Sequence, residues 1–188
     1  MGLERIENLM NKISNQVSLD SPIASERILI DTFSDEDITS EYISWLNDKE
    51  VVQFSNQRFI KHTKDSCMTF LNGFKDTDSL FVKIVSLNNK KTIGTMTAYI
   101  NSNHGTCDVG ILLGDKGIWG KGYGLEAWIL FTNWLKSHAQ IRKLTAGTSS
   151  INKPMLKILK KSNFSIECTR KQHEIIENKL VDLIYFIK

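Results

Sequence analysis

The chain has little cysteine and little histidine, and neither is spaced as a disulfide framework or a metal site requires. The three cysteines, Cys67, Cys107 and Cys168, are odd in number and lie far apart. A disulfide framework uses denser and usually even cysteines, so we expect a protein of the reducing cytoplasm. The four histidines form no HxxxH pair and lie near no CxxC motif, so we predict no metal site.

The sequence also lacks a long apolar run and a strong excess of one charge. No stretch approaches the roughly 20 apolar residues of a transmembrane helix, so we expect no membrane partner. The 24 basic residues exceed the 21 acidic ones by only three, which is too few to indicate a nucleic-acid-binding protein. A hydrophobic content of 41% over 188 residues suits one globular domain.

An extension precedes the predicted domain. Residues 3–17 place apolar side chains at three- and four-residue spacings, which is typical of a short amphipathic helix or a frayed leader. We therefore divide the chain into an N-terminal helical or flexible extension, residues 1–24, and one domain, residues 25–188. The domain opens with a β-rich run, and Ser34 with Asp37 three residues later predicts the start of its first helix.

The rest of the domain combines hairpin strands with helices. Polar turns separate the first three of these strands, which suits antiparallel hairpins. The predicted elements are a helix at 64–74, strands at 80–86, 92–100 and 106–113, a helix at 125–138, a strand at 143–148, a helix from Ser149 or Ser150, and strands at 164–171 and 180–187. This order predicts a mixed α/β domain of the α+β class.

Five of the eleven glycines lie between a predicted strand and an apolar helix: Gly114, Gly117, Gly120, Gly122 and Gly124. The first N–H groups of a helix have no partner within it, and the helix dipole adds partial positive charge there. Glycine lets a phosphate approach the backbone, and Lys121 adds a positive charge beside it. The segment therefore predicts an anion site.

Three kinds of phosphate-binding loop compete for this segment. A nucleotide P-loop needs a glycine where Asp115 stands and Ser or Thr after Lys121, where the chain has Gly122. A dinucleotide fingerprint needs GxGxxG in a parallel βαβ unit, whereas these glycines follow a predicted hairpin. Alternating glycines at the head of a helix after an antiparallel strand match a pyrophosphate cradle for coenzyme A.

Residues 25–188 resemble the GNAT N-acetyltransferase superfamily, in particular its ribosomal-protein N-terminal acetyltransferases. The resemblance rests on segments 25–30, 42–48, 108–111, 119–127 and 152–164. It implies the acyl-CoA N-acyltransferase fold, with about four helices around a mostly antiparallel sheet of about seven strands. It also implies transfer of an acetyl group from acetyl-CoA to a protein N-terminus, an amino sugar or another small amine. The transfer would proceed by direct attack, in an enzyme compatible with a homodimer.

The resemblance also assigns the site. The residues expected to bind the coenzyme are Ile111, Leu112, Leu113, Trp119, Gly120, Lys121, Gly122, Tyr123, Gly124 and Asn152, and a plain helix cap is the alternative for Asn152. In this family the strand opens near Gly110 to admit the thioester. Asp108 stands where relatives place a carboxylate that takes the amine proton, and His104 is a second candidate base. A solvated side chain is the alternative for both.

Two positions depart from the family pattern. Trp119 stands where the loop usually begins with Gln or Arg, and Leu159 stands where many relatives carry a tyrosine that protonates the departing thiolate. A thiol with a pKa near ~8.5 leaves without an acid more readily than most groups, so the loss of the tyrosine does not require loss of activity. A non-catalytic coenzyme-A-binding or regulatory module of the same fold is the alternative function.

Overall fold

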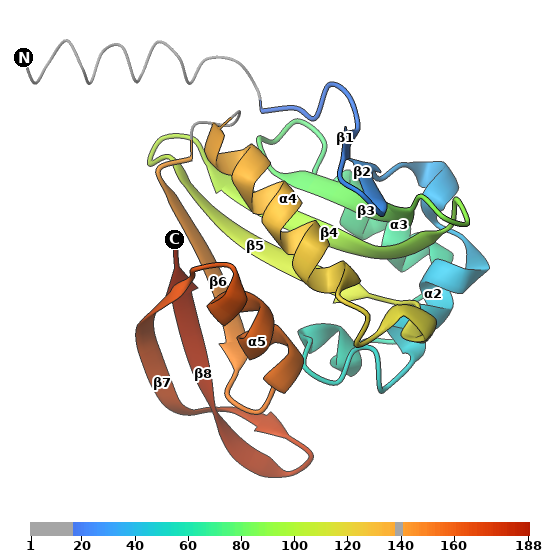
Figure 1. The fold of residues 1–188 in the computed structure, drawn as a ribbon. Coiled ribbons are helices and arrows are strands. Elements are labelled where there is room, and N and C mark those ends of the chain that lie inside the picture. The colour runs from blue at the N-terminus through green and yellow to red at the C-terminus, as the bar shows by residue number, and fades with distance from the viewer. Residues whose placement is uncertain (1–16, 138–140) are drawn as a thin grey trace, which may run out of the picture.

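The computed structural model describes residues 17–137 and 141–188, which form one eight-stranded sheet with helices on both faces (Figure 1). The strand order is β1-β2-β3-β4-β5-β6-β8-β7, and every neighbouring pair is antiparallel except β5 and β6. This is the predicted mixed α/β architecture, with one strand more than expected and four α-helices in the described residues. The helix predicted at 3–17 falls mostly outside them.

The strands are β1 (Ile23–Ala24), β2 (Ile28–Thr32), β3 (Leu80–Ser86), β4 (Thr92–Asn101), β5 (Thr106–Leu113), β6 (Lys143–Ser149), β7 (Ser165–Ile176) and β8 (Lys179–Ile187). The α-helices are α2 (Ser40–Asn47), α3 (Lys64–Asn72), α4 (Tyr123–Ser137) and α5 (Lys153–Lys161). Three short 3-10 turns join them: η1 (Asp35–Asp37), η2 (Asn56–Phe59) and η3 (Lys116–Ile118). None of these helices is long and apolar enough to cross a membrane.

The predicted start of the first helix is wrong. Ser34 and Asp37 do form a capping box, but it closes the single turn η1 and not a longer helix. The backbone leaves helical geometry at Ile38, where ψ is 66°, and α2 begins anew with the Thr39 hydroxyl accepting from the Tyr42 amide. The capping signal therefore identified the start of a helical turn at Ser34, but the longer helix starts five residues later, after Thr39.

Two apolar cores lie on opposite faces of the sheet. Trp128 and Phe131 of α4 and Leu159 of α5 are buried in the first core. Tyr42 of α2 and Cys67 of α3 are buried in the second. Because successive strand residues point to opposite faces, a residue's place in β5 decides which core it meets.

Strand β5 shows this alternation. Cys107 and Val109 pack in the core beneath α4, whereas Leu112 packs with the core beneath α2 and α3. Asp108 and Gly110 share the parity of Leu112, so they face the side of α2 and α3. On the neighbouring strand their register partners are Tyr99 and Thr97, respectively.

The sheet opens between β5 and β6. These strands pair only at Thr106 with Lys143, Cys107 with Leu144 and Asp108 with Thr145. Beyond Asp108, residues 109–113 of β5 have strand partners on the β4 side alone. One edge of β5 is therefore free close to the glycine segment that follows it.

Candidate active site

The glycine segment forms an open loop at the start of α4. Gly120 and Gly122 have φ values of +74° and +88°, which few residues other than glycine adopt. A Cβ atom on Gly120 would meet nothing within 4 Å, and one on Gly122 would meet only Nη2 of Arg27, at 3.4 Å. The backbone at these two positions is thus accessible to an incoming anion.

Unpaired amide groups line the same loop. The first hydrogen bond into α4 runs from the Glu126 amide to the Gly122 carbonyl at 3.1 Å. In the described part of the chain, the amides of residues 122–125 find no hydrogen-bond acceptor, as is usual for the first turn of a helix. The Lys121 amide differs, because it donates to the Ile118 carbonyl at 3.3 Å. The anion-binding donors that this geometry offers are therefore those of residues 122–125.

A pair of charged side chains fixes the loop to the edge of the sheet. The Glu126 carboxylate accepts from the Ser25 hydroxyl at 2.6 Å and from Nε of Arg27 at 2.7 Å. Arg27 also donates to the Lys121 carbonyl at 3.0 Å and lies over the Tyr123 ring. Burial alone would raise the pKa of Glu126, but the bonds from Ser25 and Arg27 outweigh it and lower the pKa. Glu126 therefore remains ionised and holds Arg27 against the loop.

Trp119 and Asn152 flank the open edge of β5. The Trp119 indole Nε1 donates to the Leu113 carbonyl at 3.0 Å. The Asn152 side chain accepts from the Met155 amide at 3.2 Å and donates to the Thr148 hydroxyl at 3.0 Å. Asn152 thus forms the helix cap and also ties α5 to β6, on the far side of the opening.

Asp108 lies where the opening begins, on the face of α2 and α3. Its side chain reaches solvent, but the surrounding protein shields it enough to raise its pKa to about 6. A hydrogen bond from the Val109 amide opposes this rise without cancelling it. The carboxyl group is therefore mostly ionised at pH 7 yet far more basic than an exposed aspartate.

His104 and Leu159 lie apart from this arrangement. His104 is exposed in the turn between β4 and β5, where its carbonyl accepts from Nε of Arg142 at 2.7 Å. The structure does not bring it to the glycine loop or to the opening. Leu159 is 0% exposed within the core beneath α4, so its side chain packs and offers no chemistry.

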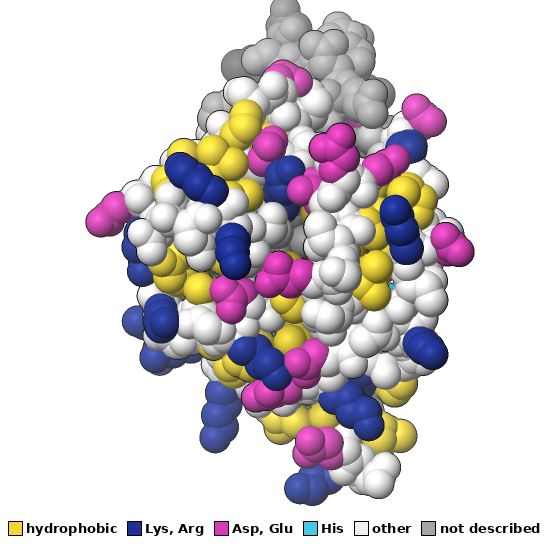
Figure 2. All heavy atoms as spheres, turned by 90° about the vertical axis from the view of Figure 1, so that its right-hand side faces the viewer, with side chains coloured by type: hydrophobic (Ala, Val, Ile, Leu, Met, Phe, Trp, Pro, Cys, Tyr) yellow, Lys and Arg dark blue, Asp and Glu magenta, His cyan; other side chains and the backbone are white. Residues whose placement is uncertain are grey.

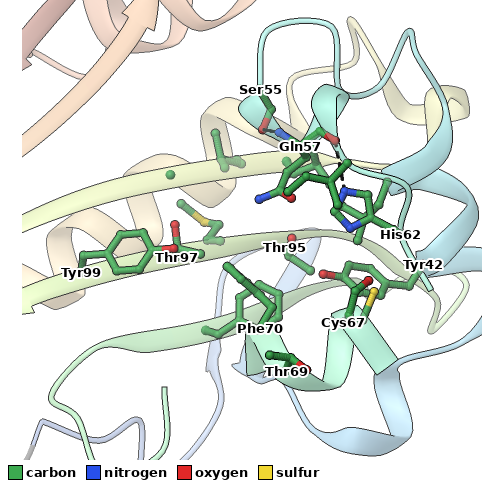
Figure 3. A pocket seen from close by; sticks show the side chains of 18 residues that line it. Tyr42, Ser55, Gln57, His62, Cys67, Thr69, Phe70, Thr95, Thr97 and Tyr99 are labelled. Atoms are coloured by element: carbon green, nitrogen blue, oxygen red, sulfur yellow. Dashed lines mark hydrogen bonds between the residues drawn. The ribbon is translucent and has the colours of Figure 1, made fainter. Parts of the chain in front are cut away.

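A cavity of about 480 Å³ lies on the Asp108 face of the sheet. Its walls come from α2, η2 and α3, and its floor comes from β3, β4 and β5, including Gly110 (Figure 3). Tyr42, His62 and Cys67 lie at one end of the view and Tyr99 at the other, with Thr95 and Thr97 between them. A volume within ~300–1,000 Å³ is typical of small-molecule sites. The cavity therefore offers a binding site that shares strand β5 with the opening.

Comparison with known families identifies the fold. The sequence profile described as "Acetyltransferase (GNAT) domain" matches residues 27–165, which is most of the chain. The chain belongs to the GNAT acetyltransferase family. The family predicted by the resemblance is thus confirmed. A comparison with curated proteins finds no match.

Solved GNAT structures superpose on most of the chain. A GNAT acetyltransferase from Bacillus anthracis is 17% identical with a TM-score of 0.75, over 89% of this chain and 98% of that one. The ribosomal-protein-S5-alanine acetyltransferase of Vibrio fischeri is 19% identical with a TM-score of 0.73, over 90% of this chain and 96% of that one. The spermidine N-acetyltransferase of Vibrio cholerae, solved with CoA and spermine, is 13% identical with a TM-score of 0.78, over 86% of this chain and 94% of that one. At these identities the likeness shows the shared GNAT fold.

Several residues of this GNAT site escaped the sequence analysis. Tyr42 and His62 line the cavity, and Glu126 fixes Arg27 beside the glycine loop. Glu126 had a readable signal, because an acidic residue in the first turn of a helix is a local feature. Tyr42 and His62 had none, since they meet only after α2 and the segment before α3 pack together.

Proposed function

We propose that the protein is an acetyl-CoA-dependent N-acetyltransferase that transfers the acetyl group directly to a primary amine. The observation that carries this proposal is the opening of the sheet beside Asp108. There the free edge of β5 lies between the glycine loop on one side and the cavity on the other. A thioester held along this edge and an amine in the cavity would meet at a single strand.

The residues present fit the coenzyme. The amides of residues 122–125 would hold the pyrophosphate, and Gly120 and Gly122 leave room for it. The edge formed by residues 111–113 would run beside the pantetheine arm, between Trp119 and Asn152. When bound, acetyl-CoA would supply the acetyl group as a thioester. The residues of the chain would bind and orient it and accept the amine proton.

Asp108 would receive the amine proton. The ammonium form of the acceptor first gives one proton to the Asp108 carboxylate, directly or through water, which frees the nitrogen lone pair. A new bond then forms between this nitrogen and the acetyl carbon while the carbon–sulfur bond breaks, the thiolate leaves with the bonding electrons, and the second N–H proton passes through water to the thiolate. A carboxyl with a pKa of about 6 lies closer to the ~8 of an α-amine than an ordinary aspartate does. This makes the proton transfer less unfavourable.

Release of free thiol from acetyl-CoA tests the proposal. We expect release to depend on an added primary amine and to exceed the slow hydrolysis seen without one. At a hundred times its Kd, acetyl-CoA should stabilise the folded state by about 2.7 kcal/mol and so raise the melting temperature. NAD should not raise it. Thiol release with no amine dependence would overturn the proposal.

One observation favours a second function, that of a coenzyme-A-binding module without catalysis. Leu159 occupies the position of the family's tyrosine acid and is fully buried in the core. No proton donor therefore stands at that place for the leaving thiolate. Binding of acetyl-CoA without thiol release for any amine would support the module.

A further inference from the structure

The cavity beside Asp108 is lined without carboxylate, ammonium or guanidinium groups, and Nε2 of its one imidazole, His62, is bonded to the Gln57 carbonyl at 3.1 Å. None of the 18 described residues that line it is an aspartate, glutamate, lysine or arginine. Aromatic rings from Tyr42, Phe70 and Tyr99 line it together with hydroxyl-bearing side chains such as Thr95 and Thr97 (Figure 3). A ligand with a second charge would therefore find no oppositely charged partner among these side chains. Because burial of an unpaired charge costs free energy, such a ligand should bind less well.

Two cationic side chains near the cavity already have hydrogen-bond partners. Lys83 is the register partner of the lining residue Thr95, and its ammonium bonds both carboxylate oxygens of Asp37 at 2.9 Å. The Arg58 guanidinium donates to the Ser55 carbonyl at 2.7 Å. On the outer surface seen in Figure 2, charges of both signs are interspersed.

Asp108 is the acidic group closest along the cavity floor. Gly110 lies two positions further along the strand, so the Cα atoms of Asp108 and Gly110 are about 7 Å apart and on the same face. A single carboxylate is thus available for the reacting amine and none for a second cation.

Two hydroxyl groups on largely buried lining residues make no hydrogen bond to the described protein and stay accessible from the cavity. Tyr42 is 5% exposed and Thr95 4% exposed, and neither hydroxyl forms a hydrogen bond within residues 17–137 and 141–188. The Tyr42 hydroxyl points into the cavity on the side of Thr95 (Figure 3). The Ser66 and Thr69 hydroxyls differ, because they bond to backbone carbonyls at Thr63 and Asp65.

A hydroxyl group that is accessible from the cavity and has no protein partner is free to bond to a ligand. Tyr42 and Thr95 therefore mark where a polar atom of the ligand would sit, on the side of the cavity away from Tyr99, the register partner of Asp108.

We propose that the acceptor is a primary amine on an uncharged, partly apolar body, with a hydrogen-bonding group that Tyr42 and Thr95 hold. This inference rests on the proposed acetyltransferase function and narrows its substrate class. The amine end lies toward Asp108, and the uncharged body fills the aromatic part of the cavity. Polyamines and phosphorylated amino sugars fall outside this class. A small amine and a polypeptide with an uncharged first residue share the chemistry.

Competition among defined amines tests the class. Two probes carry no charge besides the reacting amine: tyramine, and the C-terminal amide of a tetrapeptide of uncharged residues that begins with serine. The other two, 1,4-diaminobutane and glucosamine 6-phosphate, carry a second charge; below, the two pairs are called the uncharged and the charged acceptors. We expect kcat/KM for at least one uncharged acceptor to exceed the values for both charged acceptors by at least about tenfold. Whether tyramine or the peptide gives the higher kcat/KM distinguishes a small-amine substrate from a polypeptide. A charged probe that equals or exceeds both uncharged ones would overturn the inference and leave the transferase intact. Absence of thiol release with every probe would overturn both.

A variant that adds one charge sharpens the test. Gln57 lines the cavity, and only its backbone forms hydrogen bonds, to Ser55 and His62 among others. Gln57→Glu should therefore raise the ratio of kcat/KM for 1,4-diaminobutane over tyramine at least about tenfold. Asn56→Asp places the same charge one residue away, exposed and outside the lining, and should leave the ratio unchanged. Equal ratios in the two variants would contradict the proposal.

Removal of the Tyr42 hydroxyl separates a ligand contact from a structural one. Tyr42→Phe keeps the ring and should raise the KM for tyramine about fivefold. The melting temperature should not fall, because the hydroxyl has no protein partner to lose, and the KM for acetyl-CoA should stay unchanged. A lower melting temperature with an unchanged tyramine KM would assign the hydroxyl a structural role and overturn its part in binding.

Discussion

Replacement of Asp108 by asparagine tests the proton-transfer step most directly. The substitution keeps size and hydrogen-bonding capacity but removes the group whose pKa burial raises to about 6. We expect kcat/KM to fall by the ~10²–10⁴ that is typical of a lost general base. The KM for acetyl-CoA should change little, because Asp108 faces α2 and α3 whereas the glycine loop lies at the start of α4.

The size of the defect should depend on pH in a way that the pKa values fix. An α-amine with a pKa near ~8 is about 1% neutral at pH 6 and half neutral at pH 8, so the variant, which needs a neutral amine, should gain about fiftyfold. Asp108 is about half ionised at pH 6 and almost fully ionised at pH 8, so the wild-type enzyme should gain only about twofold. The ratio of wild type to variant should therefore shrink by roughly 25-fold over this interval.

Steady-state thiol release from pH 5 to pH 9, with saturating acetyl-CoA, measures both profiles. Asp35→Asn serves as the control, because Asp35 is an exposed acid in η1, away from the opening. Parallel wild-type and Asp108→Asn profiles, or a wild-type acid limb centred near pH 4, would refute the assignment of Asp108 as the base. The proton would then have to pass to water.

Three further predictions concern the loop, the core and the stability of the site. Gly122→Val should raise the Kd of acetyl-CoA at least about tenfold by calorimetry, whereas Gly105→Val, at another positive φ, should cost stability without changing this Kd. Leu159→Tyr should lower the free energy of unfolding in urea by about 1–3 kcal/mol and should not raise kcat, because position 159 lies in closed core. Asp108→Asn should melt above wild type at pH 8 but not below pH 4, because the raised folded-state pKa makes the wild type lose stability as pH rises through 6. An equal gain at both pH values would point to packing instead.

Local signals predicted much of this fold. The hairpin strands β3, β4 and β5 begin where alternating apolar residues and polar turns placed them, and the turn at Glu177 and Asn178 has the positive φ values that such turns use. The glycine loop was predictable for the same reason, since its residues are contiguous. The helix start at Ser34 failed because a capping box fixes one turn and does not decide how far the helix continues.

Non-local contacts account for what the sequence did not reveal. The cavity brings Tyr42, His62 and Thr95 together from three separate elements, and no spacing in the chain links them. The free edge of β5 likewise depends on where β6 stops pairing, and only the family resemblance, not a local signal, predicted an opening near Gly110. Asn152 shows the remaining limit, because its helix cap and its bond to Thr148 coexist where the sequence suggested alternatives.

Strand β5 also explains why a glycine stands at position 110. A Cβ atom there would approach Oγ1 of Thr97 to 2.7 Å, closer than real Cβ atoms come. Thr97 and Gly110 are register partners on the cavity floor, two register positions from Tyr99 and Asp108. A side chain at 110 would therefore push Thr97 into the space between the cavity and the proposed base. Glycine keeps this space clear but weakens the strand at position 110. The weakening falls where the sheet already opens.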